Sequence, residues 1–259
     1  MGLWLTASAV FFAYVAVVAA ALPSLARAGR VRAIALAFIG LAAAVGAGRV
    51  ELHFVLHDWI LPPALLLLGY WATGFLFVSP MPRAERALMA FDARLGLREL
   101  AARAPRWIAE LLELAYAGVY PVIPIALAIH LVFADRPEPG RFWAVILITD
   151  YICFGMLPWV QTRPPRALEP SEPWRAGFRR INLRLLGTAS IHVNTFPSGH
   201  AAEALAAALL AAGAPWPIAA WMFFNAAAIS AGAVLGRYHY AADALAGWVV
   251  ATAVWLATS

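Results

Sequence analysis

The chain has 259 residues, of which 63% are hydrophobic and 13% are charged, and its mean hydropathy is +0.76. This composition excludes a soluble globular domain and predicts a membrane protein with several spans. The formal net charge is +5, and the chain contains arginine but no lysine. In a membrane protein, such a charge is explained by contact with anionic lipid surfaces and by the orientation of loops across the bilayer sooner than by binding to nucleic acid. Cys153 is the only cysteine, so no disulfide can form within one chain.

Eight apolar segments of spanning or near-spanning length predict an all-α, polytopic membrane helix bundle. The segment at 200–212 is short, rich in alanine and followed by a Gly-Ala-Pro turn, so we expect it inside the bundle. The first two segments form an N-terminal pair within 1–50, and the other six form a catalytic domain over 51–259. The eight segments are 3–22, 31–47, 59–78, 108–133, 142–160, 200–212, 216–235 and 241–258.

The connection near 82–106 is too charged to cross a bilayer and is predicted to be an amphipathic helix. Leu88, Phe91 and Leu95 fall on one helical face, and arginines fall on another. Such a helix would lie in the headgroup region, where arginine can hold lipid phosphates. A solvated linker helix is an equally compatible interpretation.

The polar sequence Pro-Ser-Gly-His at 197–200 directly precedes the alanine-rich segment. Gly199 allows a bound group to approach the backbone closely, and Ser198 together with the first free N–H groups of the helix can donate to an anion. His200 adds a proton donor or acceptor that can be tuned near neutral pH. Taken alone, this turn is equally compatible with an ordinary interfacial helix cap.

Two further polar clusters fall on the same predicted side of the bilayer. Arg163 and Arg166 follow the fifth span, whereas Arg237, His239 and Asp243 open the last one. On a helix, residues four apart share a face, so the Asp243 carboxylate can hold the distal N–H of the His239 imidazole. A single ion pair of this kind also occurs at ordinary helix ends. The location of all three clusters on one side favours a common site.

Together these side chains suit phosphoryl transfer without a metal or other cofactor. His239 would attack phosphorus, and Asp243 would stabilise the cation that forms. His200 would protonate the leaving alkoxide and afterwards activate water. The equatorial phosphoryl oxygens would be bound by Arg163, Arg166 and Arg237, with further donors near Ser198 and Gly199.

At these residues the chain resembles the type 2 phosphatidic acid phosphatase superfamily, which includes lipid phosphate phosphatases. The family signature comprises Arg-Pro after a span, Pro-Ser-Gly-His, and a His followed four residues later by Asp. The resemblance covers roughly 59–258 and implies a six-helix core and a lipid phosphate substrate. It also implies that His239 is the nucleophile and forms a phosphohistidine, that Asp243 is its partner, and that His200 is the general acid.

Two positions depart from the family pattern. Met156 stands where the family usually has a lysine before Arg-Pro, and Ala233 stands where it usually has an arginine before the nucleophilic histidine. We expect Arg166 and Arg237 to take over these contacts. Pro-Pro-Arg, and an arginine shortly before His-Tyr, are similar to the branch that contains inositol phosphorylceramide synthases. That branch transfers a phosphoryl headgroup to a lipid alcohol, so both hydrolysis and transfer stay open.

Three more residues are candidates for supporting roles. Glu203 lies one turn after His200 and would either orient that imidazole or form a local helix-end pair, whereas His192 and Asn194 would contact substrate hydroxyls. Carboxylates within spans also fit a proton-coupled transporter, the alternative of a different class. Against a transporter, the sequence has no internal repeat and its charged residues cluster at one interface.

The expected partners are a lipid phosphate and the bilayer, with no nucleic acid, and the oligomeric state stays open. We predict a multi-pass protein of the cell membrane. Most arginines fall in loops on the side of the site, which the positive-inside rule makes cytoplasmic. The family resemblance instead implies a site on the outer face, so both orientations stay open.

Overall fold

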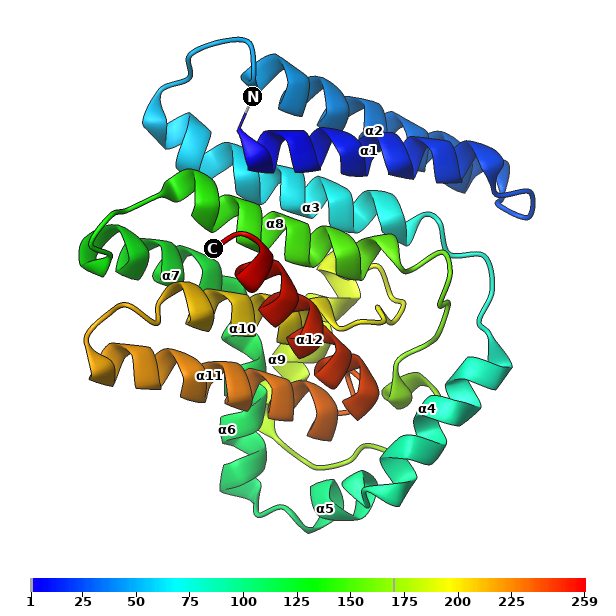
Figure 1. The fold of residues 1–259 in the computed structure, drawn as a ribbon. Coiled ribbons are helices and arrows are strands. Elements are labelled where there is room, and N and C mark those ends of the chain that lie inside the picture. The colour runs from blue at the N-terminus through cyan, green and yellow to red at the C-terminus, as the bar shows by residue number, and fades with distance from the viewer. Residues whose placement is uncertain (1, 170) are drawn as a thin grey trace.

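The computed structural model describes residues 2–169 and 171–259, and these residues fold into a bundle of helices (Figure 1). Within this part of the chain the extended structure is confined to one isolated antiparallel bridge between Thr162 and Asn194. The predicted all-α fold is therefore confirmed.

The N-terminal pair forms a layer across one side of the molecule (Figure 1). Helices α1 and α2 pack against each other, and both contact the third span, while α1 also contacts α8. Large apolar side chains are exposed on their outward faces, as they are on α11 and α12, and such exposure is typical of a surface in contact with lipid. The pair consists of α1 (Leu3–Ala21) and α2 (Arg27–Ala47), and the elements next to it are the third span, formed by the π-helical turn η1 (Val55–Ile60) and α3 (Leu61–Gly74), and α8 (Pro139–Gly155).

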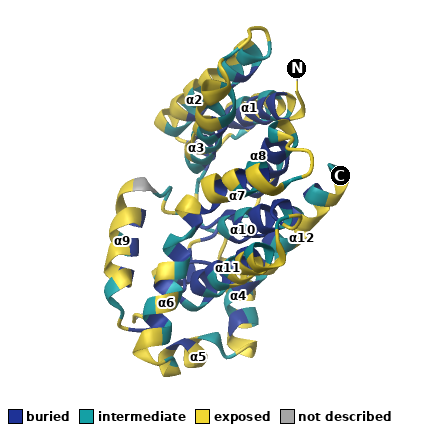
Figure 2. Cartoon of the chain, turned by 90° about the vertical axis from the view of Figure 1, so that its left-hand side faces the viewer, coloured by how far each residue is buried: buried dark blue, intermediate teal, exposed yellow. Residues whose placement is uncertain are grey.

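The short helix α10 (Gly199–Leu210) lies in the middle of the bundle, as its alanine content led us to expect. It packs against helices on all sides, and Figure 2 shows it as largely buried. Alanine side chains permit this close approach because they keep the helix narrow. Its neighbours are α7 (Val119–Phe133), α8, α11 (Trp216–Leu235) and α12 (Ala241–Ala257).

The predicted count of eight spans is not confirmed. Within the described residues, four helices are long and apolar enough to cross a membrane, namely α1, α2, the continuous η1–α3 and α11. A fifth span exists if α6 (Arg106–Ala117) and α7 act as one, although these two helices are bent by 61° at Gly118. Helices α10 and α12 are apolar but shorter. This set of helices is compatible with a multi-pass membrane protein.

The amphipathic segment near 82–106 is two helices, α4 (Pro82–Arg94) and α5 (Leu97–Arg103), where we expected one. The break falls at Gly96, whose φ of 61° lies in the left-handed region that favours glycine. Helix α4 lies along the rim of the bundle (Figure 1). The face that it buries carries two carboxylates, those of Glu85 and Asp92, and these acidic residues set the position of the site.

Candidate active site

Asn194 joins the three segments that the sequence analysis placed in one site. Its backbone N–H donates to the Thr162 carbonyl oxygen at 2.9 Å, and its Nδ2 donates to Thr162 Oγ1 at 3.0 Å and to Asp243 Oδ2 at 2.9 Å. Elsewhere the hydroxyl of Tyr240 donates to the Arg163 carbonyl oxygen at 2.9 Å. The loop after α8, the turn before α10 and the start of α12 therefore meet at one point.

The turn into α10 is built around the Ser198 cap. Ser198 Oγ accepts from the Ala201 N–H at 3.3 Å, and the Ser198 N–H donates to the Asp243 carbonyl oxygen at 2.9 Å. Two glycines allow this packing, since a β-carbon at Gly247 would lie 2.6 Å from the Ser198 carbonyl oxygen and one at Gly199 would lie 2.9 Å from the Phe154 ring. Helix α10 thus begins directly against α8 and α12, with its N-terminal end at the site.

The two histidines face each other across a short distance. The ring centroids of His200 and His239 are 5.6 Å apart. His200 stacks on Tyr116 with the ring centroids 5.4 Å apart, and Tyr116 stacks on Tyr238 at 4.1 Å. A row of aromatic rings therefore sets the position of one imidazole relative to the loop that carries the other.

Asp243 lies beside the His239 imidazole, with Oδ2 3.5 Å from Nδ1, but this contact is too long for a hydrogen bond. Asp243 Oδ2 instead accepts from Asn194 and from the Tyr240 N–H, each at 2.9 Å. Burial, and to a smaller extent the charge of Arg166, lower the pKa of His239 to about 3. The imidazole is therefore neutral at neutral pH and has a free electron pair for attack.

Two of the three predicted phosphate ligands are held by carboxylates. Arg163 Nε and Nη2 donate to the two Glu85 oxygens, each at 2.9 Å, and this interaction lowers the pKa of Glu85. Arg237 is buried between Asp92, at 2.7 Å, and Glu169, at 2.7 and 2.9 Å. The charge of each of these two arginines is therefore already paired with a carboxylate.

Arg166 is placed differently, because within the described residues no carboxylate lies within ion-pair distance of its guanidinium. Its Cζ lies 5.2 Å from the centroid of the Tyr238 ring, and its Nη1 donates to the Tyr238 carbonyl oxygen at 3.4 Å. Its charge acts on both imidazoles, those of His200 and His239. Arg166 is thus the arginine best placed to bind an anion between the two histidines.

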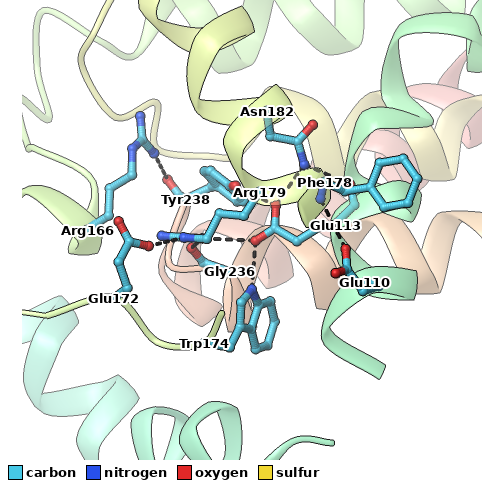
Figure 3. A network of polar contacts seen from close by, with 10 residues as sticks. All are labelled: Glu110, Glu113, Arg166, Glu172, Trp174, Phe178, Arg179, Asn182, Gly236 and Tyr238. Carbon is cyan, nitrogen blue, oxygen red and sulfur yellow. Dashed lines mark hydrogen bonds and ion pairs between the residues drawn. The ribbon is translucent and has the colours of Figure 1, made fainter. Parts of the chain in front are cut away.

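A buried glutamate, Glu113, holds in place the loop 236–240 between α11 and α12, called here the His239 loop (Figure 3). Glu113 on α6 is fully buried and accepts from four side chains. Such a network is strong because every partner is satisfied in a region of low dielectric constant. The four donors are Trp174 Nε1 at 2.8 Å, Arg179 Nη1 at 2.9 Å, Asn182 Nδ2 at 2.7 Å and the Tyr238 hydroxyl at 2.6 Å.

Helix α9 (Gly177–Ala189) contributes Arg179 to this network, and Arg179 also contacts the His239 loop directly (Figure 3). Arg179 Nη1 also donates to the Gly236 carbonyl oxygen at 2.9 Å, and Arg179 pairs with Glu172. The next residue, Arg237, has a φ of 61°, a conformation that costs a non-glycine residue about 1 kcal/mol or more. The surrounding ion pairs stabilise this turn, which places His239 opposite His200.

The three supporting residues are placed in different surroundings. Glu203 lines a cavity of about 470 Å³ together with His200. Asn194 binds Asp243 and Thr162, as described above, and its Oδ1 has no partner among the described residues. His192 is exposed, and its φ of 58° places it in a tight turn after α9. The described residues contain no group of three or more His, Cys, Asp or Glu side chains that could hold a metal ion.

Comparison with known families matches residues 82–257 to the PAP2 superfamily. Neither the curated proteins nor the solved structures that were compared give a significant match to the chain. The matched region begins at α4 and includes both histidines, the arginine clusters and the Glu113 network. The chain therefore belongs to the PAP2 superfamily, whose members are phosphatases and phosphotransferases that act on phosphate esters.

Proposed function

We propose that the protein is an integral membrane lipid phosphatase that hydrolyses a phosphate ester of a lipid through a phosphohistidine. The observation that carries this proposal is the position of His200, 5.6 Å from His239 on one side and lining an apolar cavity on the other. PAP2 membership supplies the class of reaction. The cavity supports a lipid substrate, because a hydrocarbon chain fits a site lined mainly by apolar side chains.

In the first step, His239 attacks phosphorus. Its Nδ1 faces Asp243, so Nε2 is the atom that forms the P–N bond. The P–O bond to the lipid breaks, and His200, which has accepted a proton from the bound phosphate monoester, gives this proton to the leaving alkoxide. Asp243 stabilises the positive charge that develops on His239, and Arg166 binds the phosphoryl oxygens with the first N–H groups of α10.

In the second step, His200 has lost its proton and accepts one from water. The water oxygen attacks phosphorus, the P–N bond breaks, and inorganic phosphate leaves. Transfer to a lipid alcohol is the second candidate, because it differs only in the acceptor. The apolar cavity supports this candidate as well, since a lipid alcohol bound there would have its hydroxyl next to His200.

Activity of the purified protein in detergent tests the proposal. We expect release of inorganic phosphate from a lipid phosphate, and loss of this release in His239→Ala and His200→Ala. The matched control is His53→Ala, which removes an exposed histidine outside the site. Headgroup exchange with an added lipid alcohol, without free phosphate, would assign the protein to the transferases. Absence of both reactions for all lipid phosphates would contradict the proposal.

Thiol labelling tests which side of the membrane the site faces. Arg184 is exposed on α9, and the native Cys153 is fully buried, so an Arg184→Cys variant offers one accessible thiol. A maleimide that does not cross membranes labels this position in intact cells if the site faces outward. Protection in intact cells, with labelling after lysis, assigns the site to the cytoplasmic face.

A further inference from the structure

The cavity beside His200 lies between η1–α3, α7, α8 and α10. Trp59 and Tyr120, which line it, are also partly exposed on the outside of the protein, so the cavity has an apolar opening. Its wall on α10 is formed by Gly199, His200 and Glu203. In the proposed reaction His200 protonates the leaving oxygen, and the lipid attached to that oxygen would therefore occupy this cavity.

One carboxyl group, that of Glu203, lies in the α10 wall of the cavity, and a second one, that of Asp150, lies just outside this wall. Glu203 lines it directly, whereas Asp150 on α8 lies behind Gly199, with Oδ1 3.4 Å from the position that a β-carbon at 199 would take. Asp150 is 0% exposed, and neither of its oxygens has a hydrogen-bond partner among the described residues. The two carboxyl groups are close enough to interact electrostatically.

These carboxyl groups differ from the other buried acids around the site. Glu85, Asp92 and Glu113 each bind an arginine. Within residues 2–169 and 171–259, neither Asp150 nor Glu203 forms an ion pair. A carboxylate without a cation or a donor is costly where it is buried, as Asp150 is, so this pair needs a positive charge or a proton from elsewhere.

We propose that Asp150 and Glu203 form a subsite for a primary ammonium group on the lipid alcohol that leaves from phosphorus. This inference rests on the proposed function, which places the lipid in the cavity. An ammonium group has three hydrogen-bond donors and one positive charge, so it would give the two carboxylates both hydrogen bonds and a counter-charge. The subsite would select lipid phosphates that carry an amine close to the ester oxygen, because Glu203 lies one turn along α10 from His200.

The test compares two substrates of equal chain length, a long-chain 2-aminoalkanol 1-phosphate and the corresponding alkanol 1-phosphate without the amine. We expect the wild-type kcat/KM to be at least about tenfold higher for the amine-bearing substrate, since a buried charged hydrogen bond is worth that much. Glu203→Gln should abolish this preference, so that the ratio of the two kcat/KM values falls to about one. Asp150→Asn, the second variant, should reduce the preference in the same way. Glu138→Gln, at an exposed position elsewhere, is the matched control.

Binding to His239→Ala gives a readout that does not depend on turnover. The amine-bearing lipid should raise the melting temperature of this variant more than the amine-free lipid does, and adding Glu203→Gln should remove the difference. Equal kcat/KM values for the two substrates in the wild type, or a preference that survives in both carboxyl variants, would overturn the subsite. If the wild type hydrolyses neither lipid, the proposed function fails, and the melting temperatures alone decide about the subsite.

Discussion

Arg166 lies across the ring of Tyr238, with its Cζ 5.2 Å from the ring centroid and its Nη1 3.4 Å from the carbonyl oxygen of the same residue. The position of this guanidinium therefore depends on Tyr238. Tyr238 in turn donates its hydroxyl to Glu113 and stacks on Tyr116. The proposed anion-binding group, Arg166, and the proposed nucleophile, His239, are thus fixed by the same short loop.

Replacement of Arg166 tests whether this residue binds the phosphoryl group. We expect Arg166→Ala to lower kcat/KM by about 10²–10³-fold, the usual effect of removing one charged donor from a transition state. Arg166→Lys should recover only part of the loss, because an ammonium lacks the planar fork of a guanidinium. Phosphate release from a lipid phosphate measures both effects. Arg94→Ala, at an exposed arginine of α4, is the control, and an equal loss in that variant would contradict the assignment.

We expect Arg237 to contribute more to the stability of the fold than to catalysis. Its guanidinium is 1% exposed and lies 2.7 Å from both Asp92 and Glu169. Arg237→Ala would leave two carboxylates buried without a cation, so we expect a loss of about 3–5 kcal/mol in the free energy of unfolding. Unfolding in detergent, followed by circular dichroism, measures this loss. A double-mutant cycle with Asp92→Asn should show coupling, whereas additive effects would mean that the ion pair contributes little.

The main parts of the site could be predicted from the sequence because each consists of neighbouring residues. Pro-Ser-Gly-His before an alanine-rich helix, and His239 four residues before Asp243, are local patterns whose members lie close together in the fold. The expected hydrogen bond between His239 and Asp243 is not formed, because His239 precedes α12 instead of lying on it. The partners of the arginines could not be predicted in this way. Asp92 is 145 positions from Arg237, and the two meet only because α4 docks its acidic face on the bundle. That face was visible as the spacing of Glu85 and Asp92, seven residues apart, but our prediction considered only the apolar face of Leu88, Phe91 and Leu95 and the face that carries the arginines.

The limits of apolarity as a signal explain why the predicted span at 108–133 is two helices, α6 and α7. The segment 108–133 is apolar along most of its length, yet it bends by 61° at Gly118. The bend allows Glu113 to remain on the inner side of α6, where it meets its four donors. A hydropathy pattern does not contain this information, because it depends on side chains contributed by α9 and by the loop after α11.

The Glu113 network should couple stability to catalysis. Glu113→Gln keeps the size of the side chain but removes the charge that Arg179 binds at 2.9 Å, so we expect a loss of about 2–4 kcal/mol in unfolding free energy. Because Tyr238 shares this carboxylate, kcat should fall as well, even at temperatures where the variant is fully folded. Glu99→Gln, at an exposed position of α5, serves as the control. A variant with lower stability but unchanged kcat would show that the network does not position the His239 loop.

The pH dependence of stability reports on the burial of His239. Burial lowers its pKa in the folded state to about 3, whereas the unfolded chain titrates near the ordinary value of 6.5. As the pH falls below 6.5 the unfolded state binds a proton that the folded state does not, so this residue makes the protein less stable by up to about 1.4 kcal/mol per pH unit, until the folded-state pKa is reached. Above pH 6.5 both states are neutral at this position, and its contribution does not change with pH. Melting temperatures of the wild type and of His239→Gln, measured between pH 8 and pH 4 in the same detergent, should therefore diverge only on the acid side, with the variant losing less stability. Parallel curves would mean that His239 is accessible to protons in the folded protein, and the neutral nucleophile would then have to be provided in another way.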